Sequence, residues 1–181
     1  MKISKIMNIK NTTNKLEKNE SKSDLYPKKV VIGGTFDIIH KGHEKLLKYG
    51  SKFGKLYIGI TSDEYLKKYG KYEKHDINPL IIRIKKLETF LSENDMDFDI
   101  QIINDPYGDT LETDYDYIIV SPETLSNAEK INEIRVEKGK KPLKIELCEF
   151  ELAEDNKPIS TTRIRNNELD KNGHTITYNE E

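Results

Sequence analysis

The sequence predicts an α/β fold built on a doubly wound sheet of about five parallel strands. Short apolar runs alternate with helix-like segments in a recurring βαβαβ order, and the connecting segments have the length of helical crossovers, which return each strand parallel to the last. At 181 residues, the chain also suits a single domain whose core is large enough to fold without disulfides or a structural metal.

The first core element is the apolar run 30–32, which two glycines stop, as is typical of a buried strand. Pro79 then opens a helix in which Leu80, Ile84, Leu87 and Leu91 recur at helical spacing. The remaining expected elements are helices over 41–53, 63–68 and 122–138 and strands over 55–61, 98–103, 115–120 and 143–152.

Composition limits the classes of function. The net charge of -2 and the pI near 6.1 argue against a nucleic-acid or membrane partner, because either would favour net positive charge. The lone Cys148 excludes an intramolecular disulfide, and no apolar run is long enough for a membrane span or signal peptide, so a cytoplasmic protein is expected. The expected organisation is a flexible polar extension over 1–27, a domain over 28–170 and a tail over 171–181.

The chemistry is concentrated in residues 33–43, which read GGTFDIIHKGH and run from the first strand into the first helix. Two glycines allow main-chain amides to approach an anion, Thr35 adds a hydroxyl, and His40 and His43 share one face of the helix. Ligands of open α/β sheets bind at this edge. The segment therefore predicts a phosphate-binding site that is neither a P-loop nor a GxGxxG turn.

The histidines and the cysteine of the chain are also compatible with roles outside a phosphate site. The histidine pair is also compatible with zinc, but no further ligands stand at metal spacing, so no direct protein ligand for a metal is expected. His75 and His174 lie in polar surroundings and are expected at the surface, and Cys148 is expected to be a buried structural thiol.

The segment GTFDIIHKGH resembles the T/HxGH signature of the nucleotidyltransferase superfamily, and ISTTRIR at 159–165 resembles its C-terminal motif. The stretches at 105–108, 120–124 and 131–135 further resemble the archaeal-type phosphopantetheine adenylyltransferases and the equivalent domain of eukaryotic CoA synthase. The resemblance covers 28–170. It implies a Rossmann-like HxGH nucleotidyltransferase fold and transfer of AMP from ATP to 4'-phosphopantetheine, which gives dephospho-CoA and pyrophosphate.

The same resemblance implies roles for individual residues. Thr35, His40, His43 and Arg163 would be catalytic. The residues implied in ATP binding are Gly33, Gly34, Thr35, His40, His43, Ser121, Glu123, Ser160, Thr161, Thr162 and Arg163. Candidates for the substrate phosphate are Lys67, Lys68, Lys71 and Arg83. The expected cofactor is Mg²⁺ bound with ATP, and the expected partners are ATP and 4'-phosphopantetheine, with no nucleic acid and no membrane.

Several assignments keep an alternative. Ser160 would also cap a helix, Arg83 points either to solvent or to the acceptor, and Arg165 forms either a phosphate contact or an ion pair. Asp37 is expected to shape the loop, since a carboxylate would repel triphosphate. Thr161 and Thr162 replace the more usual serines, which retains the hydroxyls but adds bulk.

For the whole protein, the alternatives are an FAD synthetase, a glycerol-phosphate cytidylyltransferase, or a non-catalytic nucleotide-binding regulator. The chemistry itself needs no general base, because the attacking phosphate oxygen is already ionised at pH 7. Holding two anions in line contributes about 7–11 kcal/mol, so histidine, hydroxyl, arginine and amide groups suffice.

Overall fold

The computed structural model describes residues 26–69 and 76–176. Five parallel strands form one sheet in the order β3-β2-β1-β4-β5, which confirms the expected α/β architecture. The strands are β1 Lys29–Gly34, β2 Lys55–Thr61, β3 Phe98–Ile103, β4 Tyr117–Val120 and β5 Lys144–Leu147. The helices are α1 Lys41–Ser51, α2 Asp63–Lys68, α4 Leu80–Glu93, α5 Leu125–Glu137 and α6 Thr161–Arg165.

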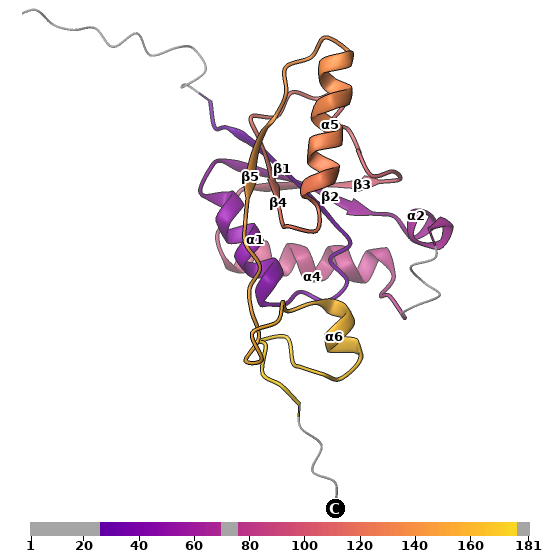
Figure 1. Ribbon diagram of the computed structural model, residues 1–181, viewed down its shortest axis with the longest axis vertical. Helices are drawn as coiled ribbons and strands as arrows, with labels where there is room; N and C mark the ends of the chain where they lie inside the picture. Colours follow the sequence, from indigo (N-terminus) through magenta and orange to yellow (C-terminus); the bar gives the residue numbers. More distant parts are fainter. Residues whose placement is uncertain (1–25, 70–75, 177–181) are drawn as a thin grey trace, which may run out of the picture.

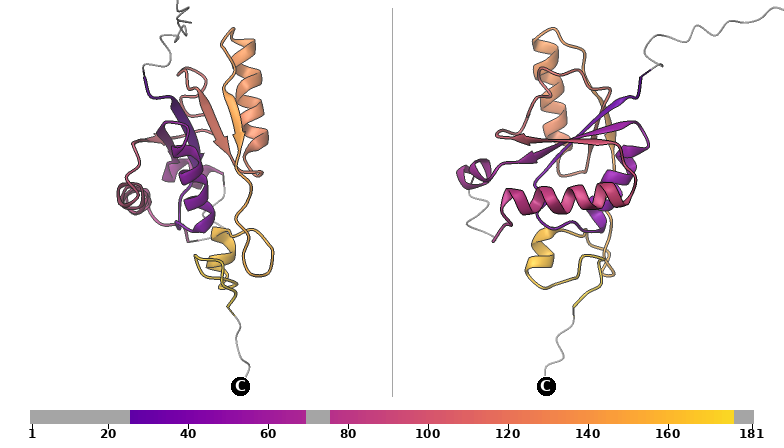
Figure 2. Two further views of the ribbon diagram at one scale, coloured as in Figure 1. Left: turned by 90° about the vertical axis from the view of Figure 1, so that its left-hand side faces the viewer. Right: turned by 180° about the vertical axis from the view of Figure 1, so that it is seen from behind.

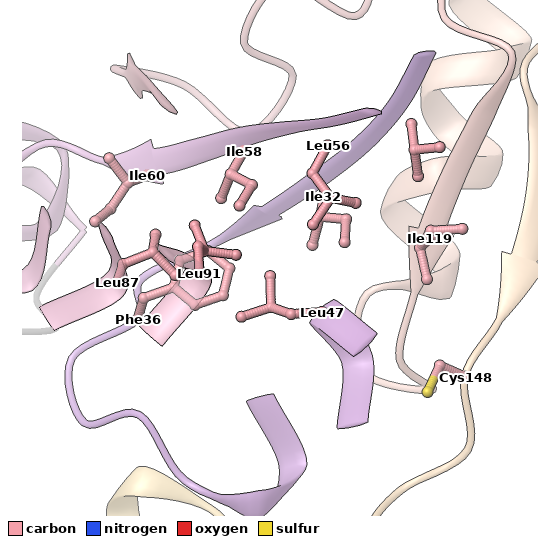
Figure 3. Close-up of a cluster of buried hydrophobic side chains, with 11 residues drawn as sticks. Ile32, Phe36, Leu47, Leu56, Ile58, Ile60, Leu87, Leu91, Ile119 and Cys148 are labelled. Atoms are coloured by element: carbon pink, nitrogen blue, oxygen red, sulfur yellow. The ribbon is translucent and has the colours of Figure 1, made fainter. Parts of the chain in front are cut away.

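Helices cover the two faces of the sheet unequally. Helices α1 and α4 lie on one face and α5 on the other (Figure 2). Leu47 of α1 and Leu87 and Leu91 of α4 point toward Ile32, Leu56 and Ile58 of the sheet (Figure 3). On the α5 face, Ala128 and Ile131 pack with residues of β1 and β4. The chain crosses from one side of β1 to the other between β3 and β4, so the carboxyl ends of β1 and β4 form a switch point where ligands bind in such sheets.

Some element boundaries differ from the sequence prediction. The fifth strand, expected over 143–152, spans only Lys144–Leu147, because β4 ends at Val120, opposite Leu147, and the chain beyond has no neighbouring strand to pair with. It turns away instead and forms an antiparallel bridge between Leu152 and Pro158. The helix expected over 122–138 starts at Leu125, because Ser121 and Thr124 close a turn first. The strand expected from residue 115 begins at Tyr117.

The C-terminal part of the described chain lies below the carboxyl edge of the sheet (Figure 1). Ala153, Ile159 and Leu169 form a small core there, and the main-chain N–H of Lys41 at the start of α1 donates to the carbonyl of Lys171 at 3.0 Å. Cys148 is 6% exposed, which confirms the expected buried thiol.

Two further expectations concern the chain ends and membranes. The segment 1–25, most of the extension expected at the N-terminus, lies outside the described residues, as does His75. Within the described stretches 26–69 and 76–176, none of the helices has the length and apolarity that crossing a bilayer requires.

Candidate active site

A cavity of about 660 Å³ opens where the carboxyl ends of β1 and β4 meet the start of α1. It brings the two sequence motifs together, although they lie far apart in the chain. The predicted residues that line it are Gly33, Gly34, Thr35, His40, His43, Ser121, Glu123, Ser160, Thr161 and Thr162. Their individual contacts with a nucleotide stay predictions.

Two glycines at the end of β1 form part of the lining of this cavity. A Cβ added at Gly33 would meet no atom within 4 Å, so the main chain there is bare on the side where a ligand can approach. A Cβ at Gly34 would lie 2.8 Å from the ring of Phe36, so glycine is needed for Phe36 to fold back. The cavity therefore has an open main-chain surface beside a tightly packed turn.

His40 serves as the N-cap of α1. Its Nδ1 accepts the main-chain N–H of Gly42 at 3.2 Å, which assigns the proton of the neutral ring to Nε2. His43 lies on the next turn, and its Nδ1 is 3.1 Å from the carbonyl of Ile38, which can only accept, so Nδ1 carries a proton. The two ring centroids are 3.9 Å apart. Together the rings form one imidazole surface on the cavity.

Burial keeps this histidine pair neutral. Burial, reinforced by the neighbouring His43, lowers the pKa of His40 to about 3. Burial also lowers the pKa of His43 to about 4, although the Ile38 carbonyl and Asp37 oppose the change. At pH 7, both rings are therefore uncharged without ligand. A polyanion in the cavity would favour the charged form and raise both pKa values.

The second motif supplies hydroxyl groups to the same cavity. Ser160 is the N-cap of α6 and its Oγ accepts the main-chain N–H of Arg163 at 3.3 Å, so the capping role expected for it is present. A Cβ on Gly42 would come within 3.5 Å of the carbonyl oxygen of Ile159, so the two motifs approach closely at this point. The tighter contact of such a Cβ would be with the His40 ring, 3.0 Å from its Cε1, so glycine at position 42 mainly leaves room for the His40 cap.

The two arginines of α6 bind carboxylates. Arg163 bonds to Asp155 at 2.6 Å and Glu168 at 2.9 Å, and it does not line the cavity described above. Its expected reach to a β- or γ-phosphate stays a prediction. Arg165 takes the ion-pair alternative. Its Nε and Nη2 bond to the Asp37 carboxylate at 2.7 and 3.0 Å.

Asp37 organises the loop between β1 and α1. It is 3% exposed, and its carboxylate also accepts the main-chain and side-chain N–H groups of Asn78, each at 2.8 Å. Burial alone would raise the pKa of Asp37, but the hydrogen bonds from Arg165 and Asn78 outweigh it and hold the pKa below its ordinary value. The ionised carboxylate therefore joins three separate segments of the chain, in keeping with its expected loop-shaping role.

The candidates for the substrate phosphate are placed differently from one another. Arg83 is fully buried, so the alternative that it points to solvent is wrong. Its guanidinium donates to the carbonyls of Thr35 and Asn78 and to Asp63. Lys67 and Lys68 are exposed on α2 and do not line the cavity. Lys71 lies outside the described residues. A phosphate contact by any of these residues stays a prediction.

Sequence reasoning assigned no place in the site to one part of the cavity wall, although residues 105–108 contributed to the family resemblance. The segment 105–110 lines it, and the Asp105 carboxylate shapes that segment by accepting the main-chain N–H groups of Tyr107 and Gly108, each at 2.8 Å. Tyr115 also lines the wall and donates its hydroxyl to Asp109. The sequence DPYG at 105–108 was itself the signal, since an aspartate and a glycine flank a turn there.

Comparisons with known proteins show which family the chain resembles. A family model described as cytidylyltransferase-like matches residues 31–167. The phosphopantetheine adenylyltransferase of Methanosarcina mazei is 45% identical over 150 residues, covering 80% of this chain and 95% of that protein. The same-named protein of Methanosarcina barkeri is 48% identical over 151 residues, covering 80% and 91%. A crystal structure of a protein of unknown function from Archaeoglobus fulgidus superposes with a TM-score of 0.60 at 36% identity, covering 66% and 88%.

Proposed function

The chain belongs to the cytidylyltransferase-like family, and on that premise we propose that it is a phosphopantetheine adenylyltransferase. It transfers AMP from ATP to 4'-phosphopantetheine and releases dephospho-CoA and pyrophosphate. The observation that carries the proposal is the single cavity lined by both the HxGH residues and the Ser-Thr-Thr residues of α6, in a chain whose relatives carry that name.

The protein must position the acceptor phosphate and ATP and stabilise the charge that develops on the phosphates during transfer. An oxygen of the acceptor phosphate forms a bond to the α-phosphorus of ATP, while the bond from that phosphorus to the oxygen bridging to the β-phosphate breaks. Pyrophosphate leaves with the electron pair of that bond. Since the attacking oxygen is already ionised, no side chain needs to remove a proton. This matches a cavity wall of imidazole, hydroxyl and amide groups.

The histidine pair is suited to the charge that develops during transfer. His40 presents its Nε2–H while Nδ1 is held by the cap, so it donates without first changing protonation. His43 can donate from Nε2 only as an imidazolium, which burial disfavours and a bound triphosphate would favour. A donor aimed at developing charge contributes about 10²–10³-fold to turnover. Thr35 and the hydroxyls of α6 add further donors.

Mg²⁺ belongs to the proposal as a companion of ATP. Across residues 26–69 and 76–176, no group of three or more His, Cys, Asp or Glu side chains could hold a metal ion. Asp37, the one carboxylate of the segment GTFDIIHKGH, is already bonded to Arg165 and Asn78. The ion would therefore be held by the phosphates, whose charge it partly neutralises. Addition of EDTA should abolish turnover, and excess Mg²⁺ should restore it.

We also assign the activity to the cytoplasm. The chain has a single cysteine, and it is buried, so folding needs no oxidising compartment. Fractionation of cells and detection of the protein with an antibody would test this location. Recovery from a membrane or extracellular fraction would contradict it.

Product identification tests the proposed reaction. The full chain is incubated with MgATP and 4'-phosphopantetheine, and dephospho-CoA is sought by mass spectrometry beside an enzymatic assay of pyrophosphate. Parallel incubations replace the acceptor with FMN, or supply CTP with glycerol phosphate. Dephospho-CoA formed only in the first incubation supports the proposal. Product only with FMN or CTP would assign a different nucleotidyltransferase, and ATP binding without pyrophosphate from any acceptor would assign a regulator.

A further inference from the structure

Phe36 adopts a strained main-chain conformation at the edge of the cavity. Its φ is +51°, a left-handed conformation that costs a non-glycine residue roughly 1–2 kcal/mol. The ring is 1% exposed, packs in the core beside Leu87 and Leu91 (Figure 3), and has its centroid 5.2 Å from that of His43. Strained residues persist where the surrounding contacts hold them firmly. The contacts on either side of Phe36 therefore matter for the site.

The residues on both sides of Phe36 are held by arginine. Before it, the carbonyl of Thr35 accepts Nη1 of Arg83 at 2.8 Å. After it, the carboxylate of Asp37 accepts Nε of Arg165 at 2.7 Å. The first bond fixes the peptide plane between Thr35 and Phe36, because that carbonyl belongs to it. The second fixes the loop that continues toward His40.

Arg83 itself has little freedom. Besides Thr35, it bonds the carbonyl of Asn78 through Nε at 2.9 Å and Asp63 through Nη2 at 2.8 Å. Its side chain is 0% exposed and it does not line the cavity. A planar fork with donors in fixed directions can satisfy all three partners, which a lysine ammonium cannot do with the same geometry. The Arg83 guanidinium therefore stabilises the loop that follows β1 and does not face the cavity.

We propose that Arg83 is a positioning residue that acts through Thr35. By holding the Thr35 carbonyl, it keeps Phe36 in its left-handed conformation and aims the Thr35 hydroxyl, which accepts a hydrogen bond from Thr61 at 3.3 Å, toward the cavity. The inference rests on the proposed function, since it assigns Arg83 a part in that transfer. This role differs from the one implied by the resemblance, in which Arg83 would contact the acceptor phosphate directly.

A double-mutant cycle separates these two roles. Turnover of ATP and 4'-phosphopantetheine is measured for wild type, Thr35→Ala, Arg83→Lys and the double variant. We expect each single variant to lose about 10²-fold in kcat/KM. The double variant should lose hardly more than either single variant, because both changes act through the Thr35 hydroxyl: alanine removes it, and loss of the Arg83 bond to the Thr35 carbonyl misplaces it. Losses that multiply would show that Arg83 acts on the substrate by another route and would overturn the proposal.

Arg135→Lys is the matched control. Arg135 is equally buried, at 1%, and also bonds main-chain carbonyls and an aspartate, Asp114. If lysine at a buried arginine position merely loosens the fold, Arg135→Lys should lose activity as much as Arg83→Lys. We expect it to retain wild-type kcat/KM per folded molecule. Asp63→Asn weakens the ion pair that holds Arg83 and should cause a smaller loss of kcat/KM with the same lack of additivity toward Thr35→Ala. This variant replaces Arg83→Lys in the cycle if Arg83→Lys does not fold.

Hydrogen exchange gives a readout that does not depend on catalysis. Amides of residues 34–38 should exchange faster in Arg83→Lys than in wild type or Arg135→Lys. Unchanged exchange there would overturn the proposal even if activity falls. If wild type forms no dephospho-CoA but the amides of 34–38 exchange faster in Arg83→Lys as expected, the proposed reaction is wrong. The inference that Arg83 holds this loop would then still be supported.

Discussion

Two buried arginines, Arg83 and Arg135, hold opposite edges of the sheet. Arg83 lies near the start of α4, at the carboxyl edge, and Arg135 near the end of α5, at the amino edge. Each spreads its donors over main-chain carbonyls and one aspartate. Burial does not distinguish them, and their hydrogen bonds are similar in number, three for Arg83 and four for Arg135. The difference lies in the partner, because Arg83 bonds the carbonyl beside the strained Phe36.

The amino-edge arginine has a different neighbourhood. Arg135 bonds the carbonyls of Thr110, Thr113 and Lys141, which joins the loop before β4 to the loop before β5. Thr110 lines the cavity but carries no predicted role in the transfer. A buried guanidinium therefore joins two loops here, whereas an identical group at the carboxyl edge bonds the loop that carries Thr35, a residue proposed to act in the transfer. The position of the partner decides the role.

The largest expected effect comes from the histidine that faces the same loop. His43→Ala should lower kcat by about 10²–10³-fold while ATP affinity changes far less, because the donor strengthens as charge builds on the phosphates. Single-turnover rates and equilibrium ATP binding measure the two quantities separately. A comparable loss in both would contradict a role in the transition state, and Arg135→Lys should leave both unaltered.

The next effect concerns stability, where the two arginines should behave alike. Arg83→Met and Arg135→Met each leave buried carbonyl groups without donors, which should lower the free energy of unfolding by about 3 kcal/mol. Urea unfolding followed by circular dichroism measures this. If one variant lost stability and the other did not, the expectation that the two arginines stabilise the fold equally would be wrong, because that expectation rests on their equal burial and similar hydrogen bonds.

The neutral histidine pair should make the carboxyl edge sensitive to acid. Unfolded, His40 and His43 take up protons near the ordinary pKa of 6.5, but in the folded protein their pKa values are about 3 and 4. The unfolded state thus binds more protons below pH 6.5. The free energy of unfolding should not be reduced by these groups above pH 6.5. It should fall as pH drops toward 4, by about 1.4 kcal/mol per pH unit for each additional proton that the unfolded state binds. Urea unfolding between pH 7 and 5 measures the slope.

Two histidine variants sharpen this test. His43→Gln should reduce the loss between pH 7 and 5 by about half, because His40 still takes up a proton on unfolding, and an unchanged slope would contradict the assignment. His174 is the control of opposite sign. It is exposed, as expected from the sequence, and its hydrogen bond to Asp170 raises its pKa. Its small contribution is present below pH 6.5 and disappears as pH rises through its folded pKa. His174→Gln should therefore not flatten the acid slope.

The smallest expected effect is at Gly33. A Cβ there meets no protein atom, so Gly33→Ala should leave the free energy of unfolding within about 0.5 kcal/mol of wild type. The same methyl group stands on the open side of the turn, and ATP affinity should fall about tenfold, or 1.4 kcal/mol. Isothermal titration calorimetry checks the affinity. Unchanged affinity would show that the nucleotide does not approach the main chain at this residue.

Sequence reasoning located the two motifs that meet at the cavity but few of the partners that the arginines bind. The histidine pair, Thr35 and the hydroxyls of α6 were identified because their spacing and their place at strand and helix ends carry the signal. The scarcity of arginine, with only four in the chain, indicated sites needing a planar donor. It did not indicate which acceptor each would meet. All four bind carboxylates in the structure, and two of them are buried.

Local patterns determined the parallel α/β architecture, the helix and strand order, and the phosphate-site motifs, because apolar periodicity, glycine and capping residues act over a few neighbouring residues. The tertiary structure alone decided that Arg165 meets Asp37, that Arg83 meets the Thr35 carbonyl and that Phe36 turns left-handed. Those outcomes depend on groups brought together from distant segments, whose distances are set only once the sheet and its helices have packed.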